Sequence, residues 1–316
     1  MAFVLRIPFY LSPGHALNNL PTSLPINGKE ATLECTNGRY LLSVRGFQTA
    51  AEAESFFEQV RPSFNWTSLQ LETSVASDRE LAKVTLREDP IADAENLLRT
   101  LGVANIGPVH GLADDVPFVF EESQNIRVTH MGQPVVTLGH PAAAFLKQFQ
   151  YGLSLPAASG TDEKLRTALD LFQAHFFETS ASARFLTLTM CLEALTGGED
   201  KPQTALALLD KWSAELKILK SSASGDDLTG YEALERELVF RREASIRSQV
   251  RRIVHESLVR VGAADADDTA KQTLKLYDKR SRLVHEGTLP AAELGDALTE
   301  IRGIVRRILE ARMTHP

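Results

Sequence analysis

The part of the chain best suited to chemistry is the segment LYDKRSRLVHEG, which runs from Leu276 to Gly287. It contains Arg280 and His285, separated by four residues. An imidazole titrates near neutral pH and can act as a general acid or a general base. A guanidinium is a planar, permanent cation that can stabilise the charge of a developing phosphorane. The pair therefore suits RNA cleavage without a metal, in which the 2′-hydroxyl of the RNA is the nucleophile.

The spacing of these two residues constrains how they could work together. Positions five apart on an ideal helix are rotated by roughly 140°, so Arg280 and His285 do not stack as i,i+4 neighbours would. Arg280 is long and His285 lies at a helix end, so both can point into one groove. Ser281 shares a face with His285 and is expected to orient its ring. One Arg and one His per chain form an incomplete acid–base set, which a two-fold homodimer would double.

A structural role is the alternative for each candidate. Arg280 would then form a surface ion pair with Asp278 or Glu286. His285 would act as a capping residue at a helix C-terminus, where the dipole favours a cation. Glu193 lies on an otherwise apolar helix face. It either holds an arginine in place or is an ordinary solvent-exposed carboxylate.

A basic stripe is the second candidate site. Arg247, Arg251 and His255 recur at i, i+4 and i+8 and could follow a phosphate backbone. The alternative is a solvated face, because Glu256 and Arg260 already form a favourable local pair there. No cysteine pair has metal-ligand spacing, and no glycine-rich phosphate loop stands out. Neither a metal nor a cofactor is expected.

Amphipathic helices are expected to position these residues in the second half of the chain. Apolar residues recur there at helical spacing, and glycines or prolines interrupt the pattern. Consecutive helices of this kind with short loops form a bundle. The segments are 165–176, 185–195, Ala205–Leu219, Leu234–Val261, Asp267–Glu286 and a last helix that Pro290 opens.

The first half has a mixed α and β pattern. Asn37-Gly38 is a strong hairpin-turn signal between two apolar runs. Helices are expected over Ala50–Val60 and Pro141–Tyr151. The expected strands are Ala2–Leu11, Ala31–Cys35, Tyr40–Phe47, Phe118–Phe120, Ile126–His130 and Val135–Leu138.

Length and composition agree with two globular domains. The 316 residues are 43% hydrophobic and 24% charged, with a formal net charge of −7, which excludes a protein coated in basic surface. Cys35 and Cys191 are expected to be buried free thiols in a reducing compartment. Trp66 and Trp212 are expected to anchor cores. No segment predicts a signal peptide or a membrane span, so a cytoplasmic protein is expected.

The motif segment resembles the HEPN family, and most closely its Apea-like branch, whose pattern is Tyr-x-x-Arg-Ser-x-apolar-Val-His-Gly. Upstream, the stretch around Glu193 and Leu195 resembles the family's Glu-x-Leu helix, and the stretch 244–254 resembles its Ser-Ile helix. The resemblance covers only the second half of the chain. The matching motif positions are Tyr277, Arg280, Ser281, Leu283, Val284 and His285, with Gly287 displaced by Glu286.

The residue patterns predict an α+β N-terminal domain over 1–153, of unknown role in sensing or binding, followed by an all-α bundle over 163–316, which the resemblance identifies as HEPN-like. The resemblance implies an RNA-binding protein or metal-independent endoribonuclease of defence (antiviral) or toxin type, acting as a homodimer on RNA or a nucleotide. Arg280 and His285 would be catalytic, with Glu193, Ser281 and Tyr277 supporting them. The rival hypotheses are a non-catalytic HEPN dimerisation or nucleotide-binding module and an interaction scaffold. Ser281 favours these rivals, because many HEPN ribonucleases have Asn, Asp or His there.

The break between the two domains can be tested directly. The stretch Leu153–Glu163, LSLPAASGTDE, is rich in Pro, Ser and Gly and is the expected linker. We expect limited proteolysis to cut it first, because exposed segments with few crossing contacts are nicked first. Mass spectrometry of the early fragments identifies the cut. A fragment starting at Thr161 that is unfolded would contradict the boundary.

Overall fold

The computed structural model describes residues 2–36, 39–76, 85–86, 118–121, 138–156, 162–198 and 200–315. By its packing the chain divides into two compact units, one of Met1–Leu188 with Leu309–Pro316 and one of Thr189–Ile308. The division falls inside two helices, α6 (Ala181–Ala194) and α11 (Ala291–Thr314). The expected order, a sheet-containing region followed by helices, is confirmed.

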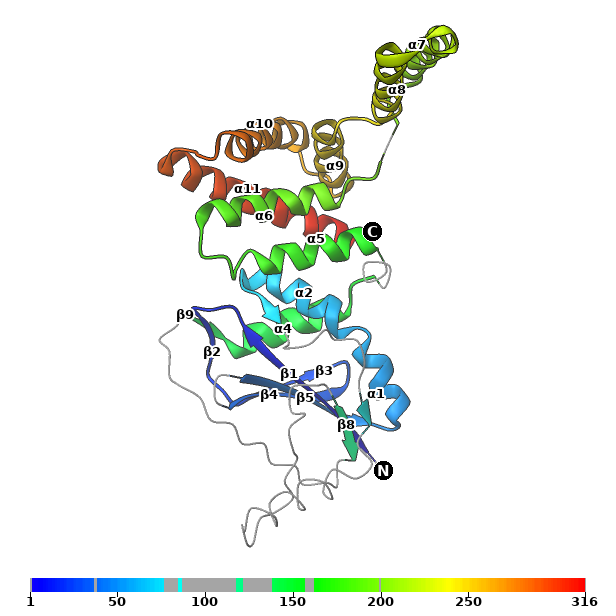
Figure 1. The fold of residues 1–316 in the computed structure, drawn as a ribbon. Helices are drawn as coiled ribbons and strands as arrows, with labels where there is room; N and C mark the ends of the chain where they lie inside the picture. Colours follow the sequence, from blue (N-terminus) through cyan, green and yellow to red (C-terminus); the bar gives the residue numbers. More distant parts are fainter. Residues whose placement is uncertain are drawn as a thin grey trace, which may run out of the picture. The chain divides into compact units, whose positions relative to one another are not determined.

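The first unit is built on a mainly antiparallel sheet (Figure 1). Its path is β3-β4-β5-β1-β8-β7, with β6 on β1, and β2 pairs separately with β9 in parallel. The bounds are β1 Phe3–Leu11, β2 His15–Asn18, β3 Thr22–Ile26, β4 Lys29–Thr36, β5 Arg39–Phe47, β6 Val75–Ala76, β7 Thr85–Leu86, β8 Phe118–Glu121 and β9 Leu138–Pro141.

The predicted β hairpin is confirmed by the pairing of β4 with β5, in which Cys35 faces Tyr40 and Thr36 faces Arg39. The strands expected near the N-terminus and at Phe118 are also present. Two expected strands cannot be compared with the structure. Ile126–His130 lies outside the described residues, and so does Val135–Leu138 except for Leu138.

Aromatic packing joins three helices to the sheet. These are α1 (Ala50–Phe57), α2 (Val60–Leu71) and α4 (Ala142–Leu153). The Phe9 ring stacks on Phe145 at 5.0 Å between centroids and touches Phe64 at 5.2 Å. All three rings are almost fully buried. Such buried aromatic contacts stabilise the unit through large apolar areas.

Helix α2 was not predicted from the sequence, which gave a single helix ending at Val60. Its buried residues include Ser63, Asn65 and Thr67, so apolar and polar side chains do not separate onto two faces. Hydrogen bonds within the chain compensate these polar groups, for example from Thr67 Oγ1 to the Ser63 carbonyl at 2.7 Å. Apolar periodicity cannot identify a helix of this kind.

Helix α5 (Glu163–Ala174) contacts α2 through polar groups. Arg61 donates two hydrogen bonds to Asp170, at 3.0 and 3.1 Å, and Gln173 donates one to Asn65 at 2.6 Å. The packing division accordingly groups α5 with the sheet. This division differs from the expected break at Leu153–Glu163. Part of that stretch lies outside the described residues, and the break stays a prediction.

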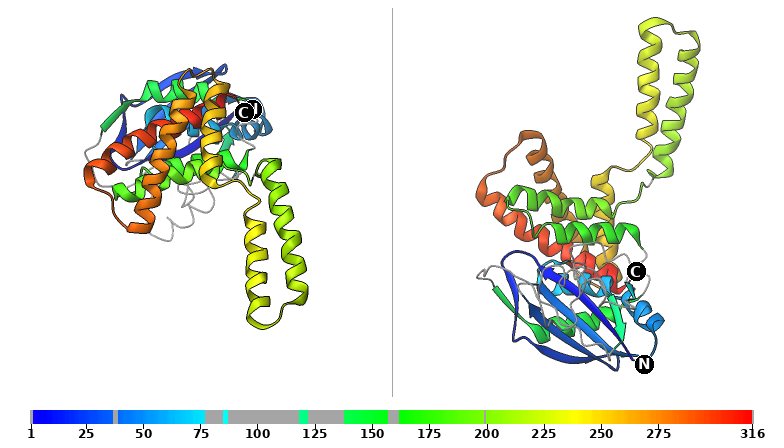
Figure 2. Two further views of the ribbon diagram at one scale, coloured as in Figure 1. Left: turned by 90° about the horizontal axis from the view of Figure 1, so that it is seen from above. Right: turned by 60° about the horizontal axis from the view of Figure 1, so that its bottom comes forward.

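The second unit contains α7 (Gln203–Ser222), α8 (Gly225–Phe240), α9 (Ile246–Arg260) and α10 (Ala266–Glu286) with parts of α6 and α11. Helices α7 and α8 form a long hairpin (Figure 2), and α9 packs along α10. Asp265, before α10, accepts two hydrogen bonds from Arg307 of α11, at 2.7 and 2.9 Å. This pairing lowers the Asp265 pKa to about 2.

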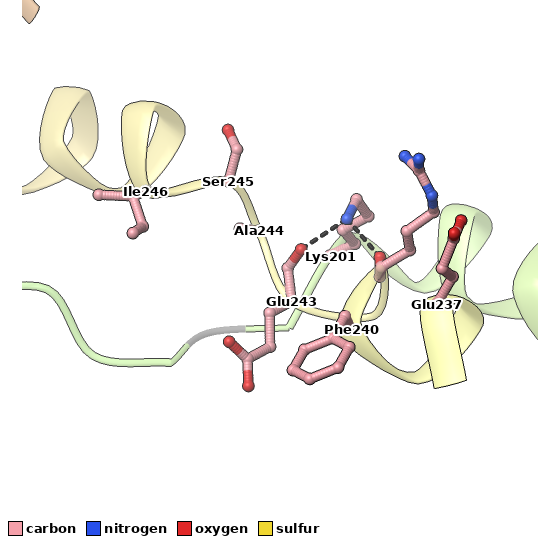
Figure 3. Close-up of a pocket in the computed structure, with 8 residues that line it drawn as sticks. Lys201, Glu237, Phe240, Glu243, Ala244, Ser245 and Ile246 are labelled. Atoms are coloured by element: carbon pink, nitrogen blue, oxygen red, sulfur yellow. Dashed lines mark hydrogen bonds between the residues drawn. The ribbon is translucent and has the colours of Figure 1, made fainter. Parts of the chain in front are cut away.

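The single helix expected over Leu234–Val261 is wrong, because α8 ends at Phe240 and α9 starts at Ile246. The chain between them is held by Lys201, whose ammonium donates to the carbonyl oxygens of Arg241 and Glu243 (Figure 3). Ser245 then caps α9 by accepting a hydrogen bond from the Ser248 amide at 3.2 Å. A serine cap gives a new helix start that competes with continuation of the first helix.

Two further expectations about burial are corrected. Cys35 is exposed although it shares a face of β4 with the buried Ala31 and Leu33, because it lies one residue from the hairpin end of the strand, while Cys191 is buried as expected. Burial raises the pKa of the Cys191 thiol. Trp66 is buried, but 46% of Trp212 is exposed. Among the described residues, no helix has the length and apolar character needed to cross a membrane.

His15 and His140 link β2 to β9. Their ring nitrogens, Nδ1 and Nε2, lie 2.9 Å apart, and the ring planes differ by 5°. The hydrogen bond requires one of the two nitrogens to be unprotonated. Burial lowers the pKa of both histidines, and repulsion from His140 lowers that of His15 further.

These shifts predict acid sensitivity. The folded protein binds protons at this pair less readily than the unfolded chain, so the free energy of unfolding falls as pH drops below the ordinary value of 6.5. We expect His140→Gln to reduce the fall of Tm between about pH 7.5 and pH 5. His255→Gln, at an exposed position, is the matched control. Equal pH slopes for wild type and His140→Gln would refute the prediction.

Candidate functional site

The candidate residues lie on the last three turns of α10. This helix runs to Glu286, as the sequence predicted, and Gly287 ends it in the left-handed conformation with φ of 78°. The Gly287 amide donates to the Leu283 carbonyl at 3.1 Å. Glycine is favoured at this position because it has no Cβ to clash in that conformation. The helix end therefore has a fixed position just after His285.

Arg280 is held by Glu193 of α6. Its Nη2 lies 3.3 Å from Glu193 Oε1, and only 26% and 21% of the two side chains are exposed. The guanidinium also lies 5.7 Å from the centre of the Tyr277 ring. The expected surface partners are engaged elsewhere, since Asp278 binds Arg247 and Glu286 pairs with Arg282. Three of the predicted site residues, Glu193, Tyr277 and Arg280, are thus brought together.

The electrostatics of this cluster follow from its partial burial. Burial raises the pKa of Tyr277, and the negative charge of Glu193, to which it is hydrogen-bonded, raises it further, so the phenol stays protonated. Arg280 opposes this effect. Arg280 Nε and Glu193 Oε1 are buried without a hydrogen-bond partner among the described residues. The guanidinium is therefore fixed by charge, with hydrogen-bonding capacity left over.

His285 lies apart from this cluster. It is exposed on the last turn of α10, and Ser281, one turn earlier, is half-buried. In the described parts of the chain, no hydrogen bond or ion pair links His285 to Arg280 or to Ser281. The expected convergence of Arg280 and His285 in one groove thus stays a prediction. An exposed imidazole on the same helix end as a fixed cation can still meet a ligand from solvent.

The basic stripe on α9 is largely neutralised by α10. Arg247 donates two hydrogen bonds to Asp278, at 2.9 and 3.0 Å, and Arg251 pairs with Asp267 at 3.6 Å. The pKa of the Asp278 carboxyl is lowered mainly by its hydrogen bond with Arg247. Both arginines remain about half exposed. They can contact a phosphate only in competition with these carboxylates.

Sequence reasoning missed a lysine-lined cleft of about 500 Å³. Lys271, Lys275 and Lys279 recur there at i, i+4 and i+8, a signal that was visible in the sequence. Carboxylates partly compensate them, because Lys271 pairs with Asp267 at 2.6 Å and Lys279 with Glu293 at 3.6 Å. The lining residues are Asp268, Lys271, Gln272, Lys275, Leu276, Lys279 and Glu300.

No group of three or more His, Cys, Asp or Glu side chains that could hold a metal occurs within the described ranges. Comparison of the chain with protein-family models, with curated proteins and with solved structures gave no match.

The partner of Arg280 predicts its contribution to stability. Arg280→Ala leaves the buried oxygen of Glu193 without its cation, which we expect to cost about 1–3 kcal/mol of unfolding free energy. Arg282→Ala, which removes exposed ion pairs from the same helix, should cost at most about 1 kcal/mol. Removing Glu193 as well should recover part of the loss. Chemical denaturation measures all three, and equal losses for the two single variants would contradict the assignment.

Proposed function

We propose that the second unit is a HEPN-type RNA-binding module that acts as a metal-independent endoribonuclease of defence or toxin type in the cytoplasm. The proposal rests on one observation: a guanidinium held by Glu193 and Tyr277 lies on the same helix end as an exposed imidazole. The motif resemblance in LYDKRSRLVHEG adds to this support. The first unit would bind or sense a ligand.

In this mechanism His285 moves the protons. It takes the proton from the 2′-hydroxyl or gives one to the leaving 5′-oxygen, and the 2′-oxygen attacks the adjacent phosphorus. The phosphorus–5′-oxygen bond breaks and a 2′,3′-cyclic phosphate is left. Arg280 stabilises the charge that develops on the non-bridging oxygens, and its fixation by Glu193 reduces the reorganisation needed. Arg247 and Arg251 would contact the RNA backbone.

The proposed active unit is a homodimer with its two-fold axis near the C-terminal end of α10. One His285 cannot be general base and general acid at the same moment, so a second copy supplies the other imidazole. Val284, which is 49% exposed beside His285, is an apolar contact available for such an interface. Isologous pairing doubles every group of the site.

A non-catalytic module is the second candidate, and a specific observation favours it. Glu193 already compensates the Arg280 charge, and Asp278 and Asp267 compensate Arg247 and Arg251. A site neutralised in this way can bind RNA or a nucleotide reversibly, but it has less uncompensated positive charge with which to stabilise a transition state. The two candidates differ in whether the RNA backbone is cut.

The test uses purified full-length protein and single-stranded RNA in EDTA. We expect cleavage that leaves 2′,3′-cyclic phosphate ends and that 2′-deoxy substitution of the cut nucleotide blocks. His285→Ala should reduce the rate about 10²–10⁴-fold. Arg280→Lys, which keeps a cation for Glu193, should reduce it about 10²–10³-fold.

Arg282→Ala is the control for this test and should cut at nearly the wild-type rate. Metal-dependent cutting with 5′-phosphate products would refute the mechanism. Absence of cutting, with RNA or nucleotide binding weakened by the same substitutions, would establish the non-catalytic module instead.

A further inference from the structure

The α7–α8 hairpin has a very small core. Four leucines and the half-buried Tyr231 form it: Leu206, Leu209, Leu216 and Leu238. More large apolar residues of the hairpin are exposed than buried. Their exposed fractions range from 45% to 81% for Leu208, Trp212, Ile218, Leu219, Leu234, Val239 and Phe240. Exposed apolar residues mark an interaction site where they are contiguous.

Part of this surface has coiled-coil spacing. Leu208, Trp212, Glu215 and Leu219 follow one another at intervals of four, three and four residues. At 3.6 residues per turn they form one stripe along α7, rotated by about 100° from the face that packs on α8. The three apolar members are 46% to 51% exposed. Heptad spacing of this kind lets a helix pack along a second helix.

Charge decides which helix fits. Glu215 interrupts the apolar stripe, and Lys211 lies 4.0 Å from it on the same helix. Two α7 helices in parallel would place two Glu215 side chains in one layer and repel each other. Antiparallel pairing instead places Glu215 beside the partner's Trp212 and the partner's Lys211, while Leu208 packs on the partner's Leu219. The stripe is therefore complementary to itself in the antiparallel direction only.

We propose that α7 binds α7 of a second copy of this chain, antiparallel about a two-fold axis between Ser213 and Ala214. The two hairpins then form a four-helix bundle, with Leu208, Trp212 and Leu219 of both copies in its centre. A ring of four charges, two Lys211 and two Glu215, lies at the axis and sums to zero. This interface is separate from the end of α10, and it stands whether or not the proposed ribonuclease activity does.

Sedimentation of the full-length chain over a concentration series tests the interface. We expect self-association, to a dimer through α7 alone or to a larger assembly if the end of α10 also pairs. Leu208→Glu with Leu219→Glu should weaken the α7 step at least about 100-fold, because buried apolar anchors carry most binding energy. Ala214→Glu is the matched control, since it places the same charge on an exposed part of α7 outside the stripe. Circular dichroism checks that each variant keeps its helices.

Charge exchange tests the direction of pairing. Lys211→Glu and Glu215→Lys should each weaken the dimer, and the double variant should restore it. A monomeric wild type at tens of micromolar overturns the proposal. So does a dimer that Leu208→Glu with Leu219→Glu leaves unchanged, which would place association on another face. Failure of the double exchange to restore the dimer overturns the antiparallel pairing. None of these outcomes depends on RNA cleavage by Arg280 or His285.

Discussion

The candidate site depends on the need to neutralise a largely buried carboxylate. Glu193 lies on α6 among apolar neighbours, with one oxygen out of contact with solvent. An isolated charge in such a place is costly, and Arg280 offsets this by approaching to 3.3 Å. Burial raises the pKa of Tyr277, and the same carboxylate raises it further. The direction of the Arg280 side chain is therefore a consequence of this ion pair, which also reinforces the protonated state of Tyr277.

The charges around this pair are arranged in a similar way throughout the second unit. Cations on α9 and α10 face carboxylates within hydrogen-bonding or ion-pair distance, as in Arg247 with Asp278 and Lys271 with Asp267. Such exposed pairs add little to stability. Their larger effect is on ligand binding, because an arginine or lysine must give up its carboxylate partner before it can bind an approaching phosphate. Added salt should weaken both the ion pairs with these carboxylates and the binding of a phosphate to the same cations.

Much of the fold could be predicted because its signals are local. The helix ending at Gly287, the helix opened by Pro290 and the hairpin at Asn37-Gly38 each have strong apolar spacing or punctuation. Helix α2 could not be predicted, because Asn65 is buried with a partner, Gln173, that only the folded chain brings to it. The break before α9 was missed for a related reason, since Lys201 holds it from a distant part of the sequence. For the site, the motif indicated Arg280 and His285 and the apolar face around Glu193 indicated that carboxylate, whereas the exposure of His285 depends on tertiary packing.

In the sequence, residues of the first unit lie both before and after those of the second unit. Gln70 donates a hydrogen bond to Glu310 at 2.6 Å, and Arg312 lies 3.9 Å from Asp162. The residues from Leu309 onward follow the whole second unit in the chain, so a ribosome makes them after it. The usual order, in which the N-terminal part of a protein completes its fold first during synthesis, does not hold here. The sheet can form early, but it acquires its last contacts only after α7–α10 have been synthesised, so a chain truncated in α11 before Ile308 lacks part of both units.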